Sequence, residues 1–239
     1  MPTTLLDKRE ARIRRMFDAI APSYDLLNHL LSFNIDRYWR WRTTRLVPPV
    51  GDAPILDLCT GTGDLALAYW KAADGKAPVY GADFCGEMLD RACVKTTRKR
   101  AADCIHYAQA DAQQLPFVDN HFQIVCVAFG LRNVTDTDRG LAEMVRVARP
   151  GGKVVVLEFS RPKGVFGGLY RFYFRSVLPR VGQALSRSKD NAYHYLPASV
   201  QEFPDGEALA ERMRRQGLKD VTWRPFTFEI ATLYVGVKP

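Results

Sequence analysis

A glycine-bearing segment after an apolar run places the strongest constraint on the fold of this 239-residue chain. Residues Ile55 to Leu58 have strand composition, Gly61 and Gly63 form a turn, and Leu65 to Trp70 continue with helix-forming residues. Glycine lets the backbone approach a ligand without a Cβ in the way. The order of strand, glycine turn and helix predicts a βα unit that binds a nucleotide cofactor.

Asp83 supports this prediction from the next apolar run. It follows Val79 to Ala82 and lies twenty residues past Gly63. A carboxylate at this place can accept hydrogen bonds from ribose hydroxyls. The alternative is a plain strand-to-helix turn, because two glycines in a turn are common and an acid at this spacing occurs by chance.

The composition of the loop bears on which cofactor it accepts. The dinucleotide fingerprint has three glycines, so that a pyrophosphate can lie on the helix N-terminus. The segment Asp57 to Asp64 lacks the third glycine, and Asp64 would repel a pyrophosphate. A cofactor with an amino-acid tail and no phosphate would not be repelled, which favours S-adenosylmethionine over NAD.

Charge and cysteine content limit the partners and the compartment. The chain has 34 Lys and Arg against 26 Asp and Glu, a net charge of +8, which suits nucleic acid or an anionic membrane surface. Each basic run taken alone is more typical of a solvated helix face. Five cysteines without CxxC spacing predict no disulfide framework and no zinc site, and they fit a reducing cytoplasm. No apolar run predicts a transmembrane span or a secretory signal.

The rhythm of the chain predicts an α/β fold. Residues 5–46 have helical composition with breaks at Pro22 and near residues 32–34, and Arg149 to Gly152 stop a helix before a strand that begins at Lys153. Five strands are expected at Ile55 to Leu58, Val79 to Ala82, Ile105 to Ala110, Ile124 to Ala128 and Val154 to Phe159. Helices are expected at 65–73, 87–101, 137–148 and 205–216.

The tail completes the predicted sheet. Val221 to Phe228 and Ile230 to Val237 read as two strands with almost no linker, which predicts an antiparallel hairpin at a sheet edge. The expected fold is therefore a Rossmann-like, doubly wound, seven-stranded sheet, mostly parallel, with N-terminal helices and a helical insertion. We expect one domain, divided into an N-terminal helical lid (1–50), a cofactor-binding core (51–160), a helical substrate or membrane insertion (161–204), and a C-terminal helix and hairpin (205–239).

Several motifs together resemble one family over nearly the whole length. Two blocks are the most specific, Tyr24 to Ser32 with Trp39, and Phe129 to Val134. The others are the Asp57 to Leu65 loop, Leu115 to Phe117, Arg146 to Gly152 and Leu157 to Ser160. With these motifs the chain resembles the ubiquinone and menaquinone biosynthesis C-methyltransferases, a family of class I S-adenosylmethionine methyltransferases. The resemblance implies C-methylation of a polyprenyl quinol ring.

The same resemblance implies how S-adenosylmethionine is held. Asp83 would bind the ribose, Asp111 and Ala112 would lie beside the adenine, and the lid would carry Tyr24. The full set of implied cofactor residues is Tyr24, Asp57, Gly61, Thr62, Gly63, Asp83, Asp111, Ala112 and Ala128. The chain departs from the family pattern at Asp36, where a histidine is common, and in the tail, where Tyr234 follows Glu229-Ile230.

Two residues after the fourth strand are the candidate catalytic pair. Methylation of a ring carbon needs a neighbouring hydroxyl to lose its proton, and a free phenol has a pKa of about 10. Arg132 would offer a fork of donors to the developing phenolate, and Asn133 would orient the hydroxyl or a water. Spacing alone also fits a turn with a solvent-exposed arginine. Asp36, His29 and His194 are candidates for a general base, and none is assigned.

Residues 165–187 have apolar side chains on one helical side and Arg171 and Arg175 on another. Such a helix could dock on an anionic bilayer and admit a polyprenyl tail. The same pattern is equally typical of an ordinary amphipathic helix that faces the protein core. The expected location is the cytoplasm, with peripheral contact at the inner face of the membrane, and a homodimer is compatible with this picture.

Two other classes of function stay open. A nucleic-acid methyltransferase would suit the basic charge, although Phe129 to Asn133 stand where an Asn-Pro-Pro-Tyr motif would be. A small phenol is another substrate of the same chemistry. A non-catalytic, cofactor-binding scaffold would suit the departures at Asp36 and Tyr234. The sequence does not choose between a naphthoquinol and a benzoquinol.

Overall fold

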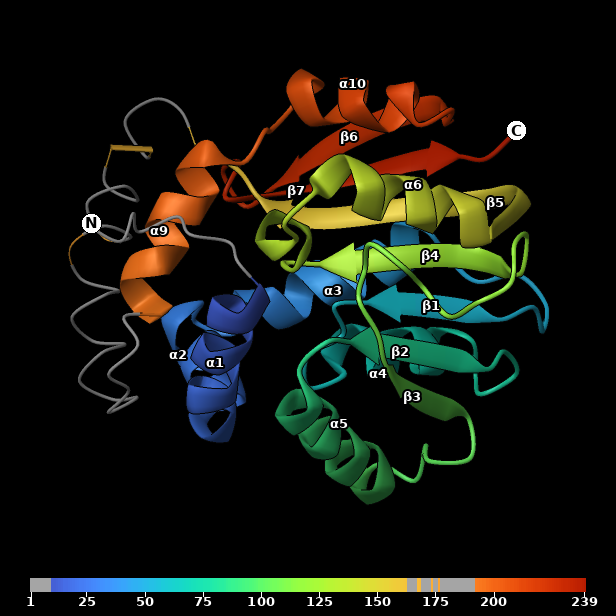
Figure 1. Cartoon of the computed structure of the whole chain (residues 1–239), viewed down its shortest axis with the longest axis horizontal. Coiled ribbons are helices and arrows are strands. Elements are labelled where there is room, and N and C mark those ends of the chain that lie inside the picture. The colour runs from blue at the N-terminus through green and yellow to red at the C-terminus, as the bar shows by residue number, and fades with distance from the viewer. Residues whose placement is uncertain (1–9, 163–166, 169–172, 174–175, 177–191) are drawn as a thin grey trace.

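The computed structural model describes residues 10–162, 167–168, 173, 176 and 192–239 (Figure 1). The helix expected over residues 165–187, with Arg171 and Arg175, lies almost wholly outside these residues. The backbone of His194 is described as part of a helix, but its side chain is not.

Seven strands form one sheet in the order β3-β2-β1-β4-β5-β7-β6. The first five strands pair in parallel, β7 pairs antiparallel with β5, and β6 pairs antiparallel with β7. Their bounds are β1 Ile55–Leu58, β2 Val79–Asp83, β3 Ile105–Gln109, β4 Phe122–Ala128, β5 Ala148–Phe159, β6 Lys219–Phe226 and β7 Ala231–Val237. The predicted fold, with its C-terminal hairpin at an edge, is confirmed.

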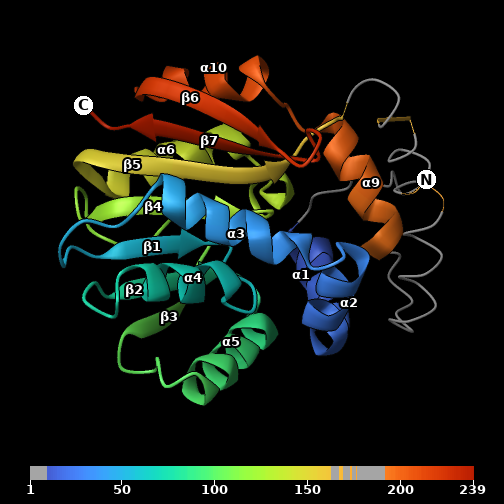
Figure 2. The same cartoon turned by 180° about the vertical axis from the view of Figure 1, so that it is seen from behind.

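Helices cover both faces of the sheet (Figures 1 and 2). On one face, α6 (Thr137–Val147) and α10 (Glu207–Arg215) pack against the sheet in an apolar core that includes Leu141, Met144 and Leu209. The core on the other face contains Trp39 from α3 (Ile35–Leu46) and Tyr69 from α4 (Asp64–Ala72). The central strands are buried from both sides, which is why they read as continuous apolar runs. The remaining core helix, α5 (Gly86–Arg98), contacts β2 and β3.

The N-terminal helices lie near the carboxyl ends of the parallel strands. They are α1 (Glu10–Ile20), a 3₁₀ turn η1 (Ala21–Ser23), α2 (Tyr24–Leu31) and α3, so the break predicted at Pro22 is confirmed. In both views α1 and α2 lie beside α9 (Ala192–Glu202). A third apolar cluster joins these elements to α5 through Met16, Tyr195 and Met88. None of the helices in the described part of the chain combines the length and the apolar character that a membrane crossing requires.

Several strand boundaries differ from the sequence prediction, and two of the differences have a clear physical cause. Strand β5 begins at Ala148, because Ala148 already pairs with Phe122, and residues 149–152 form a bulge before Lys153 pairs with Ile124. The expected turn at Arg149 to Gly152 is therefore an interruption within a strand. At the other edge, the predicted β6 runs too far: positive φ angles at residues 227–229 make these the hairpin turn.

Candidate active site

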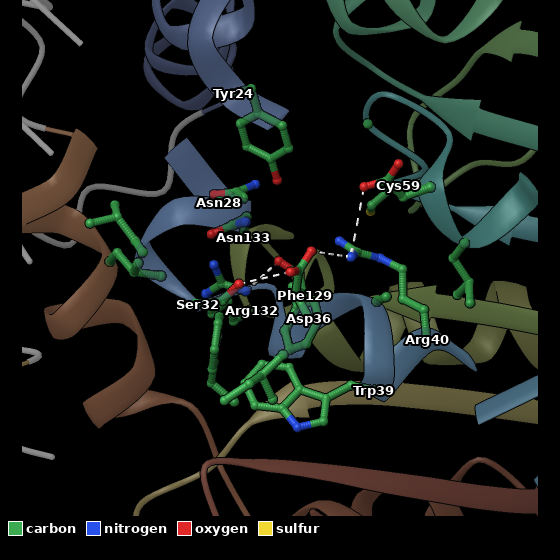
Figure 3. A pocket seen from close by; sticks show the side chains of 18 of the residues that line it. Tyr24, Asn28, Ser32, Asp36, Trp39, Arg40, Cys59, Phe129, Arg132 and Asn133 are labelled. Atoms are coloured by element: carbon green, nitrogen blue, oxygen red, sulfur yellow. Dashed lines mark hydrogen bonds and ion pairs between the residues drawn. The ribbon is translucent and has the colours of Figure 1, made fainter. Parts of the chain in front are cut away.

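A cavity of about 620 Å³ lies between the N-terminal helices and the carboxyl ends of β1, β4 and β5 (Figure 3). The glycine loop contributes Gly61 and Thr62, and α2 contributes Tyr24. Arg132 and Asn133 line it from η2 (Leu131–Asn133), which follows β4. The structure thus brings the predicted catalytic pair, the cofactor loop and the predicted lid residue to one cavity.

The loop after β1 is held in shape by Asp57. Its Oδ2 accepts hydrogen bonds from Thr60 Oγ1 at 2.6 Å and from Ala66 N at 3.0 Å, which ties the loop to the first turn of α4. Burial raises the pKa of Asp57 to about 7, although these hydrogen bonds favour the charged form. Asp57 lines the cavity, and its hydrogen bonds show that it also shapes the backbone of the loop.

The two loop glycines have different surroundings. Both have positive φ angles, 56° at Gly61 and 82° at Gly63. A Cβ on Gly61 would face the cavity and meet only Tyr24 Cε1, at 3.9 Å. A Cβ on Gly63 would clash with the Tyr107 hydroxyl, and Gly63 lines neither of the cavities described here. Gly63 thus lets α4 pack closely on β3, while Gly61 opens the loop.

A smaller cavity of about 80 Å³ adjoins the first at the ends of β1, β2 and β4. It is lined by six of the predicted cofactor residues, Tyr24, Gly61, Asp83, Asp111, Ala112 and Ala128. The Asp83 carboxylate accepts hydrogen bonds from Gly61 N at 2.8 Å and from Cys85 N at 3.0 Å, while burial raises its pKa. A carboxylate has about four acceptor sites, so these two bonds leave capacity for ribose hydroxyls. The free acceptor sites of Asp83 therefore fit the ribose of a nucleoside.

Ion pairs join the N-terminal helices to the loop. Lys95 of α5 contacts Asp25 of α2 at 2.6 Å and Asp64 at 2.8 Å, and Thr62 Oγ1 donates to Asp25 at 2.5 Å. Arg40 of α3 also lies 3.7 Å from Asp64. We call this set, Asp25, Arg40, Thr62, Asp64 and Lys95, the helix–loop network.

The network corrects one step of the sequence argument, which treated Asp64 as an uncompensated charge. Burial opposes ionisation of Asp64, but Arg40 and Lys95 outweigh it and lower the pKa of that carboxyl. The aspartate is therefore anionic, and its charge is balanced by two cations within the protein. The exclusion of a pyrophosphate rests on the missing third glycine more than on this charge.

Arg132 is buried and held from several sides. Its Nη1 lies 2.8 Å from Oε1 of Glu158 on β5 and also donates to the Phe129 carbonyl, and its guanidinium lies 5.3 Å from the centre of the Phe159 ring. Its Nε and the Oδ1 of Asn133 are buried without a hydrogen-bond partner. The prediction of a fork of donors that all face the ligand is modified, because Nη1 is occupied within the protein and Nε is a buried donor without a partner.

Three aromatic rings form one wall of the cavity, Trp39, Phe129 and Phe159. Ring centres are 5.7 Å apart for Trp39 and Phe129, and 4.5 Å apart for Phe129 and Phe159. Trp39 Nε1 donates to Thr227 Oγ1 at 2.8 Å, which fixes the indole. Such a wall suits a flat aromatic ligand. The sequence analysis did not predict this wall, although Phe129 directly after β4 and Phe159 at the end of β5 were signals for it.

The candidate general bases, and the residues at which the chain departs from the family pattern, lie in different parts of the structure. Asp36 lines the cavity; burial opposes its charge, but Arg40, Ser32 and His29 outweigh this and lower its pKa, so it is a weak base. His29 Nδ1 lies 2.8 Å from Asp36 Oδ2 and does not line the cavity. Tyr234 lies in the core beneath α10, where its hydroxyl accepts from Gly206 N at 2.7 Å. The departure at Tyr234 is therefore structural, whereas Asp36 stands in the site.

A parallel sheet with an antiparallel hairpin, a glycine loop after β1, an acid at the end of β2 and a cavity beneath added helices define a Rossmann-like methyltransferase. Residues 5–238 match the model of the ubiE/COQ5 methyltransferase family, and the chain belongs to that family. The expected class, an S-adenosylmethionine-dependent C-methyltransferase of quinone biosynthesis, is confirmed by this membership.

Relatives named for this chemistry cover nearly the whole chain. The chain is 45% identical to a ubiquinone/menaquinone biosynthesis C-methyltransferase UbiE of Citrifermentans bemidjiense, over 98% of this chain and 99% of that one. It is 47% identical to a demethylmenaquinone methyltransferase of Thermus thermophilus, over 94% and 100%. Among solved structures, an S-adenosylmethionine-dependent methyltransferase of Thermotoga maritima matches with a TM-score of 0.67 at 17% identity, covering 95% of this chain and 100% of that one, which supports the fold.

Proposed function

We propose that this protein transfers a methyl group from S-adenosylmethionine to a ring carbon of a polyprenyl quinol. The observation that carries the proposal is the 620 Å³ cavity, in which the glycine loop, the aromatic wall, Arg132 and Asn133 meet. The names of the relatives support a quinone-pathway substrate. The N-terminal helices then serve as a lid over the cavity.

The residues fit the cofactor in two parts. When bound, S-adenosylmethionine supplies an electrophilic methyl group on a sulfonium. We assign the nucleoside to the smaller cavity, with Asp83 accepting from the ribose and Asp111 and Ala112 beside the adenine. Gly61 and Thr62 line the larger cavity, where the Tyr24 ring lies next to Gly61. Ala128 lines both cavities and marks the place where cofactor and substrate would meet.

The substrate ring lies, in this proposal, against the aromatic wall with an oxygen near Arg132. Transfer of the hydroxyl proton to water raises electron density at the neighbouring carbon, and the fixed positive charge of Arg132 stabilises the phenolate. After methylation the same carbon loses its hydrogen to water, which restores the aromatic ring. Asn133 Oδ1 accepts from the hydroxyl or from a water before that proton leaves. Burial strengthens these interactions, because little water competes with them. Orientation of the ring toward the methyl group supplies much of the remaining rate.

A lipid-like substrate gives the exposed apolar side chains of the lid a role. Leu26, Leu30 and Phe33 have exposed fractions of 70%, 50% and 73%, and Phe33 also lines the cavity. With the net charge of +8, this supports peripheral contact with an anionic bilayer from the cytoplasmic side. Sedimentation with vesicles of anionic and of neutral lipid tests the contact. Equal binding to both would contradict a role of the positive charge in membrane binding. The homodimer stays a prediction, which a molar mass measured by light scattering would test.

The test is methyl transfer from labelled S-adenosylmethionine to demethylmenaquinol and to a polyprenyl benzoquinol, each kept reduced. Transfer to either ring supports the proposal, and the ratio of kcat/KM values identifies the preferred ring. Transfer to RNA and to neither quinol would instead identify a nucleic-acid methyltransferase. Cofactor binding without transfer to any acceptor would identify a scaffold. Arg132→Ala should abolish most transfer while it leaves cofactor affinity unchanged.

A further inference from the structure

Among the described residues, seven side-chain polar atoms are buried without a partner, and three of these belong to residues that line one cavity. They are Nε of Arg132, Oδ1 of Asn133 and the hydroxyl of Tyr195. A buried polar atom without a hydrogen bond costs about 1–3 kcal/mol, so such atoms are rare unless something else satisfies them. Their gathering at one cavity points to a polar ligand group there.

Tyr195 approaches the cavity from α9, far along the chain from Arg132. Only 3% of its surface is exposed, and its ring packs in the apolar cluster with Met16 and Met88. Helix α9 contacts η2, and the charge of Arg132 acts on the Tyr195 hydroxyl. The tyrosine is thus held by its ring, while its hydroxyl has no partner within the described protein.

We propose that Tyr195 is a substrate-binding residue, whose hydroxyl donates a hydrogen bond to the ring oxygen that Arg132 also binds. The proposal rests on the proposed function, in which that oxygen belongs to a quinol. A neutral donor beside a cation stabilises the phenolate and fixes the direction of its lone pairs. Burial also raises the pKa of Tyr195, so its proton stays in place during the reaction and the residue acts by hydrogen bonding alone.

The test compares Tyr195→Phe with Tyr69→Phe. Tyr69 lies in the core on α4, its hydroxyl is likewise buried without a partner, and it lines neither cavity. We expect Tyr195→Phe to lower kcat for the quinol about 10²-fold, as loss of one oxyanion donor does, and to move the acid limb of the kcat–pH profile to higher pH. Tyr69→Phe should leave kcat within about twofold, because it removes only a core hydroxyl.

Ligand binding separates this inference from the proposed function. Calorimetry with 1,4-naphthohydroquinone, in the presence of S-adenosylhomocysteine and a reductant, should show about tenfold weaker binding to Tyr195→Phe than to wild type. If wild type methylates no quinol but this difference appears, the proposed function fails and the Tyr195 site stands. Unchanged binding, kcat and pH profile in Tyr195→Phe, with the wild type active, would overturn the role of Tyr195.

Discussion

Nη1 of Arg132 and Oε1 of Glu158 lie 2.8 Å apart, and at most 7% of either side chain is exposed. The arginine follows β4 and the glutamate lies on the neighbouring strand β5, so the pair joins the carboxyl ends of two central strands. Glu158 Oε1 also accepts from Phe159 N at 2.9 Å, which fixes the carboxylate. The guanidinium is therefore oriented before any ligand arrives, and Glu158 is a positioning residue for Arg132.

Glu158→Gln should show how much of the role of Glu158 depends on its charge, because glutamine has nearly the same shape. The amide can still accept from Nη1, but the buried cation loses its counter-charge, and removal of one partner of such a pair costs about 3–5 kcal/mol. We expect lower stability in urea and at least about a tenfold lower kcat, with cofactor affinity unchanged. Glu207→Gln, which breaks an exposed ion pair with Arg214, is the matched control and should leave stability almost unchanged. Equal losses in both variants would show that burial of the pair is unimportant.

The core of the fold was predictable because its strands are buried on both faces. Strand β4 is buried along its length except at Ala128, so its composition identifies it without any knowledge of its neighbours. The start of β5 was missed because the bulge at residues 149–152 is defined by pairing with β4, and Pro150 with two glycines resembles a plain turn. A strand boundary that depends on pairing with a neighbouring strand cannot be predicted from the local sequence.

The helix–loop network should control opening of the lid. In Asp64→Asn, Lys95 and Arg40 lose a shared partner between the core and the N-terminal helices. We expect faster amide hydrogen exchange in α2 and α3 and unchanged exchange in β4, because the network ties the helices without supporting the sheet. Glu87→Gln removes a neighbouring exposed charge on α5 and should leave all exchange rates unchanged. Uniformly faster exchange in Asp64→Asn would instead indicate global destabilisation.

Gly130 permits close contact between two strand ends of the site. A Cβ at this position would overlap the Cβ of Cys59, whose own backbone has a φ of 51°. Gly130→Ala should therefore displace the cofactor loop and destabilise the protein by about 1–3 kcal/mol, measured in urea, with weaker cofactor binding. Gly151→Ala is the control for backbone strain alone, since its Cβ meets nothing within 4 Å although φ is 73°. If only Gly151→Ala weakened cofactor binding, the role of close packing at Gly130 would be wrong.

The site was partly predictable for a related reason. Arg132, Asn133, Asp83 and the loop follow strands, so topology alone placed them at one edge of the sheet. Tyr195 was missed because its helix reaches the cavity only through tertiary packing. Glu158 left one signal that could have been used: it is a charged residue inside the apolar run Val154 to Phe159, and a buried acid needs a cationic partner.

Asp57 makes a specific prediction about pH. Its pKa is 3.8 in the unfolded chain and, through burial, about 7 in the folded protein. Between these values the folded state holds a proton that the unfolded state lacks, so stability falls as pH rises. The loss begins above pH 3.8 and is complete above about pH 7, and it amounts to on the order of 4 kcal/mol.

Asp57→Asn should remove this part of the pH dependence. Asparagine can still accept from Thr60 and Ala66, so the loop keeps its hydrogen bonds, but no proton is released. Carboxyls with lowered pKa values, such as Asp36 and Asp64, give the opposite slope in both proteins and cancel in the comparison. Urea unfolding from pH 5 to pH 8 should therefore show wild type losing stability relative to Asp57→Asn. A difference that stays constant across this range would mean that Asp57 is already charged in the folded protein at pH 5.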